Sequence, residues 1–180
     1  NKDNILLVLS SDHLIKDKTN FLKSIDSAIN LALKDRLVTF GVIPTSAETG
    51  FGYIESFKKL NIETYEGSEI SQFIEKPNKK LAEKLILGKR YSWNSGMFIF
   101  KASNLISELK KFSPEVLNCC KESINKEKKD LDFQRLDIDS FKNCPSISID
   151  VAVMEKTKIG SVVPLNAGWS DVGNWKSLWE

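Results

Sequence analysis

The stretch that decides the fold is ILLVLSSDH at residues 5–13, a short apolar run that ends in two serines and an aspartate. An uninterrupted apolar run of this length is typical of a strand that is covered on both faces in a parallel sheet. Asp12 would then lie at the carboxyl end of that strand. Residues 21–33 follow with apolar side chains on one helical stripe, and Asp17 or Thr19 could cap this helix.

A second apolar strand at residues 37–43 completes a strand–helix–strand unit, and such units are right-handed crossovers that build parallel sheets. Further strand patterns occur at residues 51–57, 69–74, 91–101 and 159–165. Helical patterns occur at residues 77–87, 102–112, 114–125, 149–155 and 172–179, with Ser103 and Ser113 as candidate caps. We therefore predict a single α/β domain over residues 1–180, with a Rossmann-like mixed, mainly parallel sheet flanked by helices.

Composition excludes several classes of protein. The net charge is only +2, from 26 basic and 24 acidic residues, so no broad positive surface is expected for nucleic acid or an anionic membrane. No apolar run approaches the roughly 20 residues that cross a bilayer. The three cysteines lack metal-ligand spacing, and the chain has only one histidine, which argues against a zinc site. Free cysteines of this kind favour a reducing, cytoplasmic setting.

Two aspartates follow predicted strands. Asp12 ends the first strand, and Asp171 lies in GWSDVG at residues 168–173, just after the strand at 159–165. Ligands of open α/β sheets bind outside the carboxyl ends of the strands. Two carboxylates there could share Mg²⁺, which prefers carboxylates and substrate phosphate oxygens. The alternative is that each aspartate only caps its own turn.

The segment FIEKP at residues 73–77 ends another strand with an acid and a base. Adjacent strand residues point to opposite faces, so we predict that Glu75 and Lys76 do not neutralise each other. Lys76 could meet a phosphate as a point charge, and Glu75 could accept hydrogen bonds from sugar hydroxyls. A solvent-exposed strand end is the equally open alternative.

Two further segments could approach a ligand. TGFGY at residues 49–53 carries alternate glycines, which permit close approach to a ligand or simply a twisted turn. WNSGM at residues 93–97 presents Asn94, which could bond vicinal sugar hydroxyls or the local backbone. His13 is the sole histidine and directly follows Asp12, so a Ser-His-Asp hydrolase is not favoured.

Together these strings resemble the bacterial mannose-1-phosphate guanylyltransferases. The resemblance covers nearly all of the chain, because six motifs occur in the family's order: LVLSSDH, LVTFGVIPTSAETGFGYIE, FIEKP, YSWNSGMFIFKAS, SIDVAVMEKT and VVPLNAGWSDVGNWKSLWE. It implies a nucleotide-diphospho-sugar transferase fold. It also implies roles for seven residues: Asp12 and Asp171 as Mg²⁺ ligands, Gly52, Glu75 and Asn94 as sugar contacts, Lys76 as the ligand of the sugar phosphate, and Asp150 as a further substrate-binding residue.

The implied reaction joins mannose 1-phosphate to GTP and releases pyrophosphate, with catalysis by Asp12, Lys76 and Asp171. The family's glycine-rich nucleotide signature is expected before residue 1, so we expect this chain to be a fragment. Many relatives carry a phosphomannose isomerase domain behind this one, although isomerase activity is not supported for this chain. A glucose-1-phosphate nucleotidyltransferase and a non-catalytic sugar-phosphate-binding module are the alternatives. A homo-oligomer is compatible with the sequence, which is otherwise silent on oligomeric state.

Overall fold

The computed structural model describes residues 3–173 and 175. These residues divide into two compact units, a larger one from residues 1–104 and 158–180 and a smaller one from residues 105–157, where we expected a single domain. The helix predicted at residues 172–179 falls largely outside the described residues. Within the described part of the chain, none of the helices is long and apolar enough to cross a membrane.

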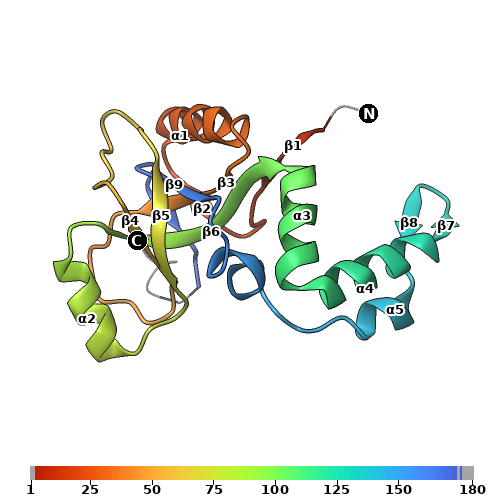
Figure 1. Cartoon of the computed structure of the whole chain (residues 1–180). Coiled ribbons are helices and arrows are strands. Elements are labelled where there is room, and N and C mark those ends of the chain that lie inside the picture. The colour runs from red at the N-terminus through yellow and green to blue at the C-terminus, as the bar shows by residue number, and fades with distance from the viewer. Residues whose placement is uncertain (1–2, 174, 176–180) are drawn as a thin grey trace. The chain divides into compact units, whose positions relative to one another are not determined.

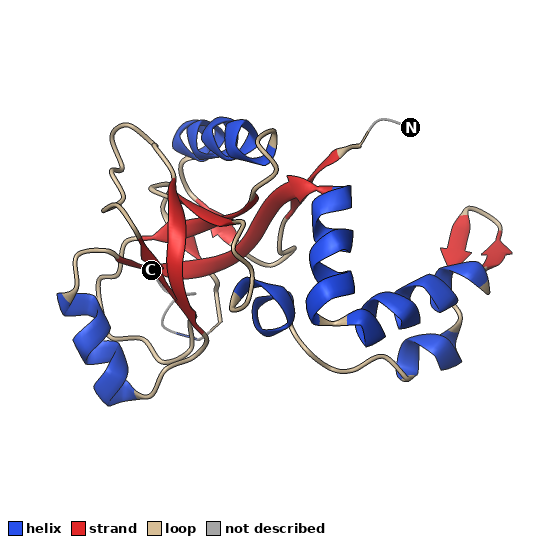
Figure 2. Ribbon diagram, viewed as in Figure 1, coloured by secondary structure: helices blue, strands red, loops and turns tan. Residues whose placement is uncertain are grey.

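The larger unit is a sheet with two helices (Figures 1 and 2). Its elements are β1 (Ile5–Val8), β2 (Leu14–Ile15), α1 (Lys18–Ala32), β3 (Leu37–Val42), β4 (Tyr53–Ser56), β5 (Ser68–Ile74), α2 (Lys79–Leu87), β6 (Tyr91–Lys101), β9 (Gly160–Pro164) and β10 (Trp169–Ser170). The helix α3 (Ala102–Phe112) begins in this unit and continues into the smaller one. The smaller unit also contains α4 (Pro114–Asn125), β7 (Lys128–Asp130), β8 (Phe133–Arg135), α5 (Ile138–Lys142) and the π-helix η1 (Asp150–Met154).

The six-stranded sheet has the order β1-β6-β3-β9-β5-β4, and β4 also pairs with β6. The predicted mixed sheet is confirmed, but the expected parallel majority is wrong. Among the described strands only the β3–β9 pair of this sheet is parallel. The reason is that β6, which comes later in the chain, lies between β1 and β3 and runs antiparallel to both.

Strand β1 therefore has a different environment from the one predicted. It forms an edge of the sheet, and residues 6–9 keep between 41% and 47% of their surface exposed instead of being covered on both faces. The apolar run correctly predicted a strand. It did not show how many layers cover that strand, because burial depends on elements distant in sequence.

Helix caps follow the sequence in part. Asp17 caps α1, as one of the two predicted candidates, by accepting the backbone N–H of Asn20 at 3.0 Å. Ser103 is not a cap, because α3 already begins at Ala102 and the Ser103 N–H donates to Asp3 Oδ1 at 3.1 Å. Ser113 stands at the cap position of α4 without a side-chain capping bond.

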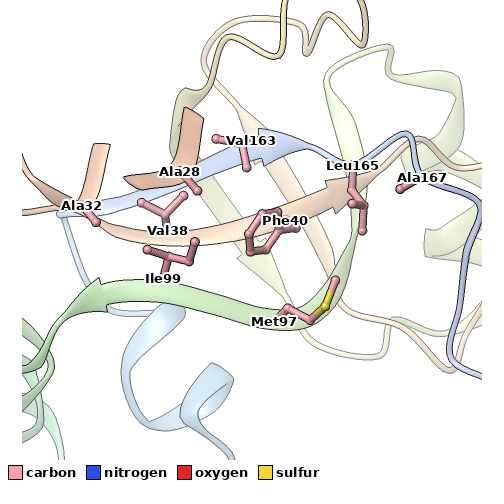
Figure 3. Close-up of a cluster of buried hydrophobic side chains, with 9 residues drawn as sticks. All are labelled: Ala28, Ala32, Val38, Phe40, Met97, Ile99, Val163, Leu165 and Ala167. Carbon is pink, nitrogen blue, oxygen red and sulfur yellow. The ribbon is translucent and has the colours of Figure 1, made fainter. Parts of the chain in front are cut away.

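The core of the larger unit lies between α1 and one face of the sheet (Figure 3). Ala28 and Ala32 are fully buried, and their small side chains allow the helix to approach the sheet closely. They pack against alternate residues of three neighbouring strands and the segment after β9: Val38, Phe40, Met97, Ile99, Val163, Leu165 and Ala167. Phe40 is completely buried at the centre of this cluster.

We predict that Phe40→Ala lowers the free energy of unfolding by about 3–5 kcal/mol, because it removes a buried ring and leaves a cavity. Phe57→Ala is the matched control, since Phe57 is 61% exposed. It should change stability by less than about 0.5 kcal/mol. Urea unfolding followed by circular dichroism measures both, and similar losses in the two variants would contradict this description of the core.

Candidate active site

The first part of the site is a short ribbon in which β2 pairs antiparallel with β10, so that Leu14 lies opposite Ser170. Asp12 stands two residues before Leu14, and Asp171 directly follows Ser170. Both aspartates therefore leave the same end of the ribbon, although they are 159 positions apart in the chain. The predicted approach of the two acid-bearing loops is present in the structure.

The turn that carries Asp171 is strained and closely bonded. Val172 has a φ of 50°, which is rare for a β-branched residue, and its N–H donates to Ser170 Oγ at 3.1 Å. Asp171 Oδ1 accepts the Gly173 N–H at 3.2 Å. Asp171 thus caps its own turn through Oδ1, which was the alternative to a metal ligand in the sequence analysis. Such strain is commonly found at functional sites, where surrounding contacts maintain it.

Asp12 and Asp171, called the acid pair below, are the residues that could hold a metal ion in this site. Among residues 3–173 and 175, no group of three or more His, Cys, Asp or Glu side chains could hold a metal ion. Mg²⁺ is usually bound through one or two carboxylates together with substrate phosphates and water. Asp12 and Asp171 match that number and type of ligand.

The second part of the site crosses three strands. Tyr53 of β4 is paired on one side with β5 and on the other with β6, which places the preceding Gly52 between Glu75 and Asn94. The Asn94 N–H donates to the Gly52 carbonyl at 2.8 Å. A β carbon at Gly52 would lie only 2.6 Å from Glu75 Oε2, so the missing side chain is what allows the carboxylate to lie there.

Asn94 is buried and is oriented by a residue that the sequence analysis missed. Thr39 Oγ1 lies 2.8 Å from Asn94 Oδ1 and 3.0 Å from the Met97 carbonyl oxygen, and its hydroxyl group is the donor to these two acceptors. This contact holds the carboxamide from the neighbouring strand β3. A hydroxyl residue inside the otherwise apolar run of β3 is the sequence signal that could have identified Thr39.

The prediction that Glu75 and Lys76 stay apart is wrong. Lys76 Nζ lies 3.7 Å from Glu75 Oε1, and the lysine side chain is 65% exposed while the glutamate is 23% exposed. The strand ends at Ile74 and Lys76 has a φ of 44°, so the alternation of a strand no longer separates the two side chains. An acid and an exposed cation therefore lie side by side just after the end of β5.

The two parts of the site meet at one edge of the sheet. Asn94 is opposite Gly41 near the carboxyl end of β3, and the Leu165 N–H donates to the Gly41 carbonyl at 2.8 Å. Gly41 therefore lies between Asn94 on one side and Leu165 on the other, and Leu165 begins the segment that leads from β9 to Asp171. Side chains confirm the approach, because the ring of Phe51, next to Gly52, lies 5.5 Å from that of Trp169 between centroids.

Asp150 begins η1 and belongs to the smaller unit, so the structure gathers the other six predicted site residues in the larger unit. The Asp150 carbonyl accepts the Glu155 N–H at 2.9 Å. The sequence predicted a short helix here but not its π-helical form. Single turns of π-helix are often found at functional sites.

The cysteines all lie in the smaller unit as free thiols. Partial burial raises the pKa of the Cys119 thiol, and the adjacent thiol of Cys144 raises it further. A raised pKa disfavours the thiolate, which is the form that attacks electrophiles or binds metal. The Cys119 thiol is therefore held mainly in its unreactive protonated form.

The larger unit is a mixed sheet with two carboxylates, a lysine and a buried carboxamide near the ends of its strands. Comparison with known families shows which family has this fold. The model of the nucleotidyl transferase family matches residues 1–180, and the chain belongs to that family.

Curated relatives are similar over the whole chain. It is 46% identical over 180 residues to a mannose-1-phosphate guanylyltransferase of Salmonella typhimurium, covering 100% of this chain and 37% of the relative. It is 46% identical over 176 residues to the xanthan biosynthesis protein XanB of Xanthomonas campestris, covering 98% and 37%. The chain thus spans little more than a third of the length of these relatives.

Solved structures share the fold. One is a mannose-6-phosphate isomerase from Helicobacter pylori, with a TM-score of 0.85 and 37% identity, covering 94% of this chain and 65% of that chain. Another is a mannose-1-phosphate geranyltransferase from Thermus thermophilus, with a TM-score of 0.81 and 29% identity, covering 97% and 48%. These similarities confirm the predicted nucleotide-sugar transferase fold.

We predict that Gly52→Ala displaces the Glu75 carboxylate and weakens binding of mannose 1-phosphate at least about tenfold, the cost of about one charged hydrogen bond. Gly50→Ala is the control, since a β carbon there would meet nothing within 4 Å. Calorimetric titration of the full-length protein measures both affinities. Unchanged binding in Gly52→Ala would show that Glu75 does not need this position.

Proposed function

We propose that the protein carrying this chain is a mannose-1-phosphate guanylyltransferase, which forms GDP-mannose and pyrophosphate from mannose 1-phosphate and GTP. The observation that carries the proposal is the row of Glu75, Gly52 and Asn94 on three adjacent strands, at the edge where the ribbon with Asp12 and Asp171 lies. The names of the curated relatives support the same substrates.

In this proposal Glu75, Gly52 and Asn94, which lie side by side at β5, β4 and β6, bind the sugar. The Glu75 carboxylate accepts hydrogen bonds from hydroxyls, while the Asn94 carboxamide both donates and accepts them. Gly52 lets the sugar ring approach the backbone. Because Thr39 holds the carboxamide by its oxygen, Asn94 meets the ligand in one orientation and loses little side-chain entropy on binding.

The phosphate of mannose 1-phosphate would lie against Lys76, whose ammonium is largely exposed and within reach of Glu75. On binding, the lysine exchanges part of its interaction with Glu75 for the phosphate, and the freed carboxylate turns to the sugar. This exchange would couple recognition of the phosphate to recognition of the sugar, since one ion pair opens to serve both.

The chemical step is an in-line displacement at the α-phosphorus of GTP. A phosphate oxygen of mannose 1-phosphate forms the new O–P bond, and the bond from the α-phosphorus to the bridging oxygen breaks, with its electron pair leaving on pyrophosphate. Both reactants are anions, so the protein has to align them and offset their repulsion. Mg²⁺ bound to Asp12 and Asp171 would supply charge neutralisation for the phosphates.

Several broader features belong to this proposal. A further isomerase domain in the full-length protein is supported by the similarity to the Helicobacter pylori isomerase. Asp150 stays a predicted substrate-binding residue, a homo-oligomer is compatible with the sequence, and the free thiols support a cytoplasmic location. Glucose 1-phosphate remains the competing sugar phosphate, and titration with both sugars decides between them.

We predict that Asp12→Asn and Asp171→Asn each lower kcat/KM for GDP-mannose formation at least about 100-fold, because each removes one charge from the Mg²⁺ site. Asp26→Asn, on the exposed side of α1, is the control and should retain full activity. Binding of Mn²⁺, followed by electron paramagnetic resonance, should weaken in both site variants. Activity within a few-fold of wild type in either one would refute its role.

We also predict that Lys76→Gln weakens binding of mannose 1-phosphate by about 10- to 100-fold, the range for a charge-assisted hydrogen bond. Free mannose lacks the phosphate, so its affinity should change by less than about twofold. Lys79→Gln, three residues further along at the start of α2, controls for general loss of positive charge. Equal losses for the two ligands would contradict a phosphate contact.

A further inference from the structure

A continuous row of aromatic rings joins the two parts of the site, and neither the predicted roles nor the proposed function uses it. Trp93 and Phe51 lie 5.2 Å apart between ring centroids, and Phe51 and Trp169 lie 5.5 Å apart. Trp169 and His13 follow at 5.4 Å in an edge-to-face arrangement with an interplanar angle of 85°. We call these four residues the aromatic row.

Each member of the aromatic row stands beside a site residue in the chain. One end of the aromatic row, Trp93 and Phe51, lies beside the proposed sugar contacts, because Trp93 precedes Asn94 and Phe51 precedes Gly52 in the chain. Its other end lies on the ribbon, where His13 follows Asp12 and Trp169 stands two residues before Asp171. The row thus passes from the sugar-binding strands to the acid pair without a gap.

The ribbon needs such support, because its two strands contain only two residues each. A two-stranded pair is marginal by itself, so contacts from its side chains decide how it lies against the sheet. Trp169 packs on the core cluster and touches Phe51, which fixes the ribbon relative to the start of β4. Edge-to-face and tilted ring contacts are directional, so they restrict angle as well as distance.

The last contact of the row also fixes the imidazole. Trp169 Nε1 donates to His13 Nδ1 at 3.2 Å. The indole nitrogen can only donate, so Nδ1 accepts and the ring proton lies on Nε2. One hydrogen bond thereby sets the tautomer and the rotation of His13, which is bonded directly to Asp12 in the chain. Its loss would free the loop that carries the first acid.

We propose that Trp169 is a positioning residue that sets the acid pair at a fixed distance and angle from the sugar-phosphate site, through Phe51 on one side and His13 on the other. This inference rests on the proposed function for the identity of the two ligands. Reactions between bound groups depend steeply on geometry, so a small displacement of the acids would lower turnover while each ligand still binds.

The test compares variants that keep or remove the hydrogen bond within the full-length protein. Trp169→Phe keeps a ring against Phe51 and removes the donor, while His13→Leu removes the acceptor. Each should lower kcat about tenfold or more with KM for mannose 1-phosphate changed less than about twofold, as expected for misplaced reacting groups. The double variant should be no worse than either single one, because both remove the same bond.

Two matched variants separate positioning from packing. His13→Asn places an acceptor oxygen where Nδ1 lay and should restore kcat to within about threefold of wild type. Trp175→Phe makes the same substitution at a tryptophan that is 88% exposed, and should leave all parameters unchanged. Thermal unfolding should be similar in these variants. Should Trp169→Phe fold poorly, the His13→Leu and His13→Asn pair decides the question alone.

A second readout does not depend on turnover. In the wild type, Mn²⁺ measured by electron paramagnetic resonance and mannose 1-phosphate measured by calorimetry should each tighten the binding of the other, since the phosphate completes the metal site. Trp169→Phe and His13→Leu should lose this mutual enhancement while binding each ligand singly as well as wild type does. Wild-type enhancement and kcat in both variants would overturn the inference.

The outcomes also separate the inference from the proposed function. A wild-type protein that couples Mn²⁺ to mannose 1-phosphate but forms no GDP-mannose would refute the proposed activity and leave the positioning role standing if the variants uncouple the ligands. A protein that forms GDP-mannose with full efficiency after Trp169→Phe and His13→Leu would refute the positioning role alone. Loss of both single-ligand affinities together with stability would assign Trp169 to packing only.

Discussion

The structure of the larger unit depends on one strand, β6, which pairs antiparallel with β1, β3 and β4. With eleven residues it is longer than any other described strand. Strand β3 pairs with both halves of β6, whereas β1 pairs only with the carboxyl half and β4 only with the amino half. Asn94 stands where these two sets of pairings meet, so the position of the candidate sugar contact follows from the pairing of this strand.

The two parts of the site are held in place in different ways. The row of Glu75, Gly52 and Asn94 is held by ladder pairing and by the hydroxyl of Thr39. The acid pair, in contrast, lies on a ribbon of two-residue strands and a strained turn, whose placement relies on side chains.

Local patterns predicted the elements well, since most helices and strands begin and end within a few residues of the expected positions. Errors arose where a local rule met a distant or exceptional feature. The crossover rule placed β1 and β3 in one parallel sheet, but β6 separates them. Strand alternation kept Glu75 from Lys76, but the left-handed backbone at Lys76 ended that alternation. Thr39, Phe51 and Trp169 were missed because their role lies in contacts with residues far along the chain.

The sequence by itself determined the types of the longer elements, two candidates for the cap of α1, the family and seven candidate site residues, because these depend on periodicity and on short motifs that are local in the chain. Only the tertiary structure decided which strands pair, which layer covers each strand and how the loops of Asp12 and Asp171 come together. Those features arise from contacts between residues far apart in the chain, and such contacts leave no period or spacing in the sequence.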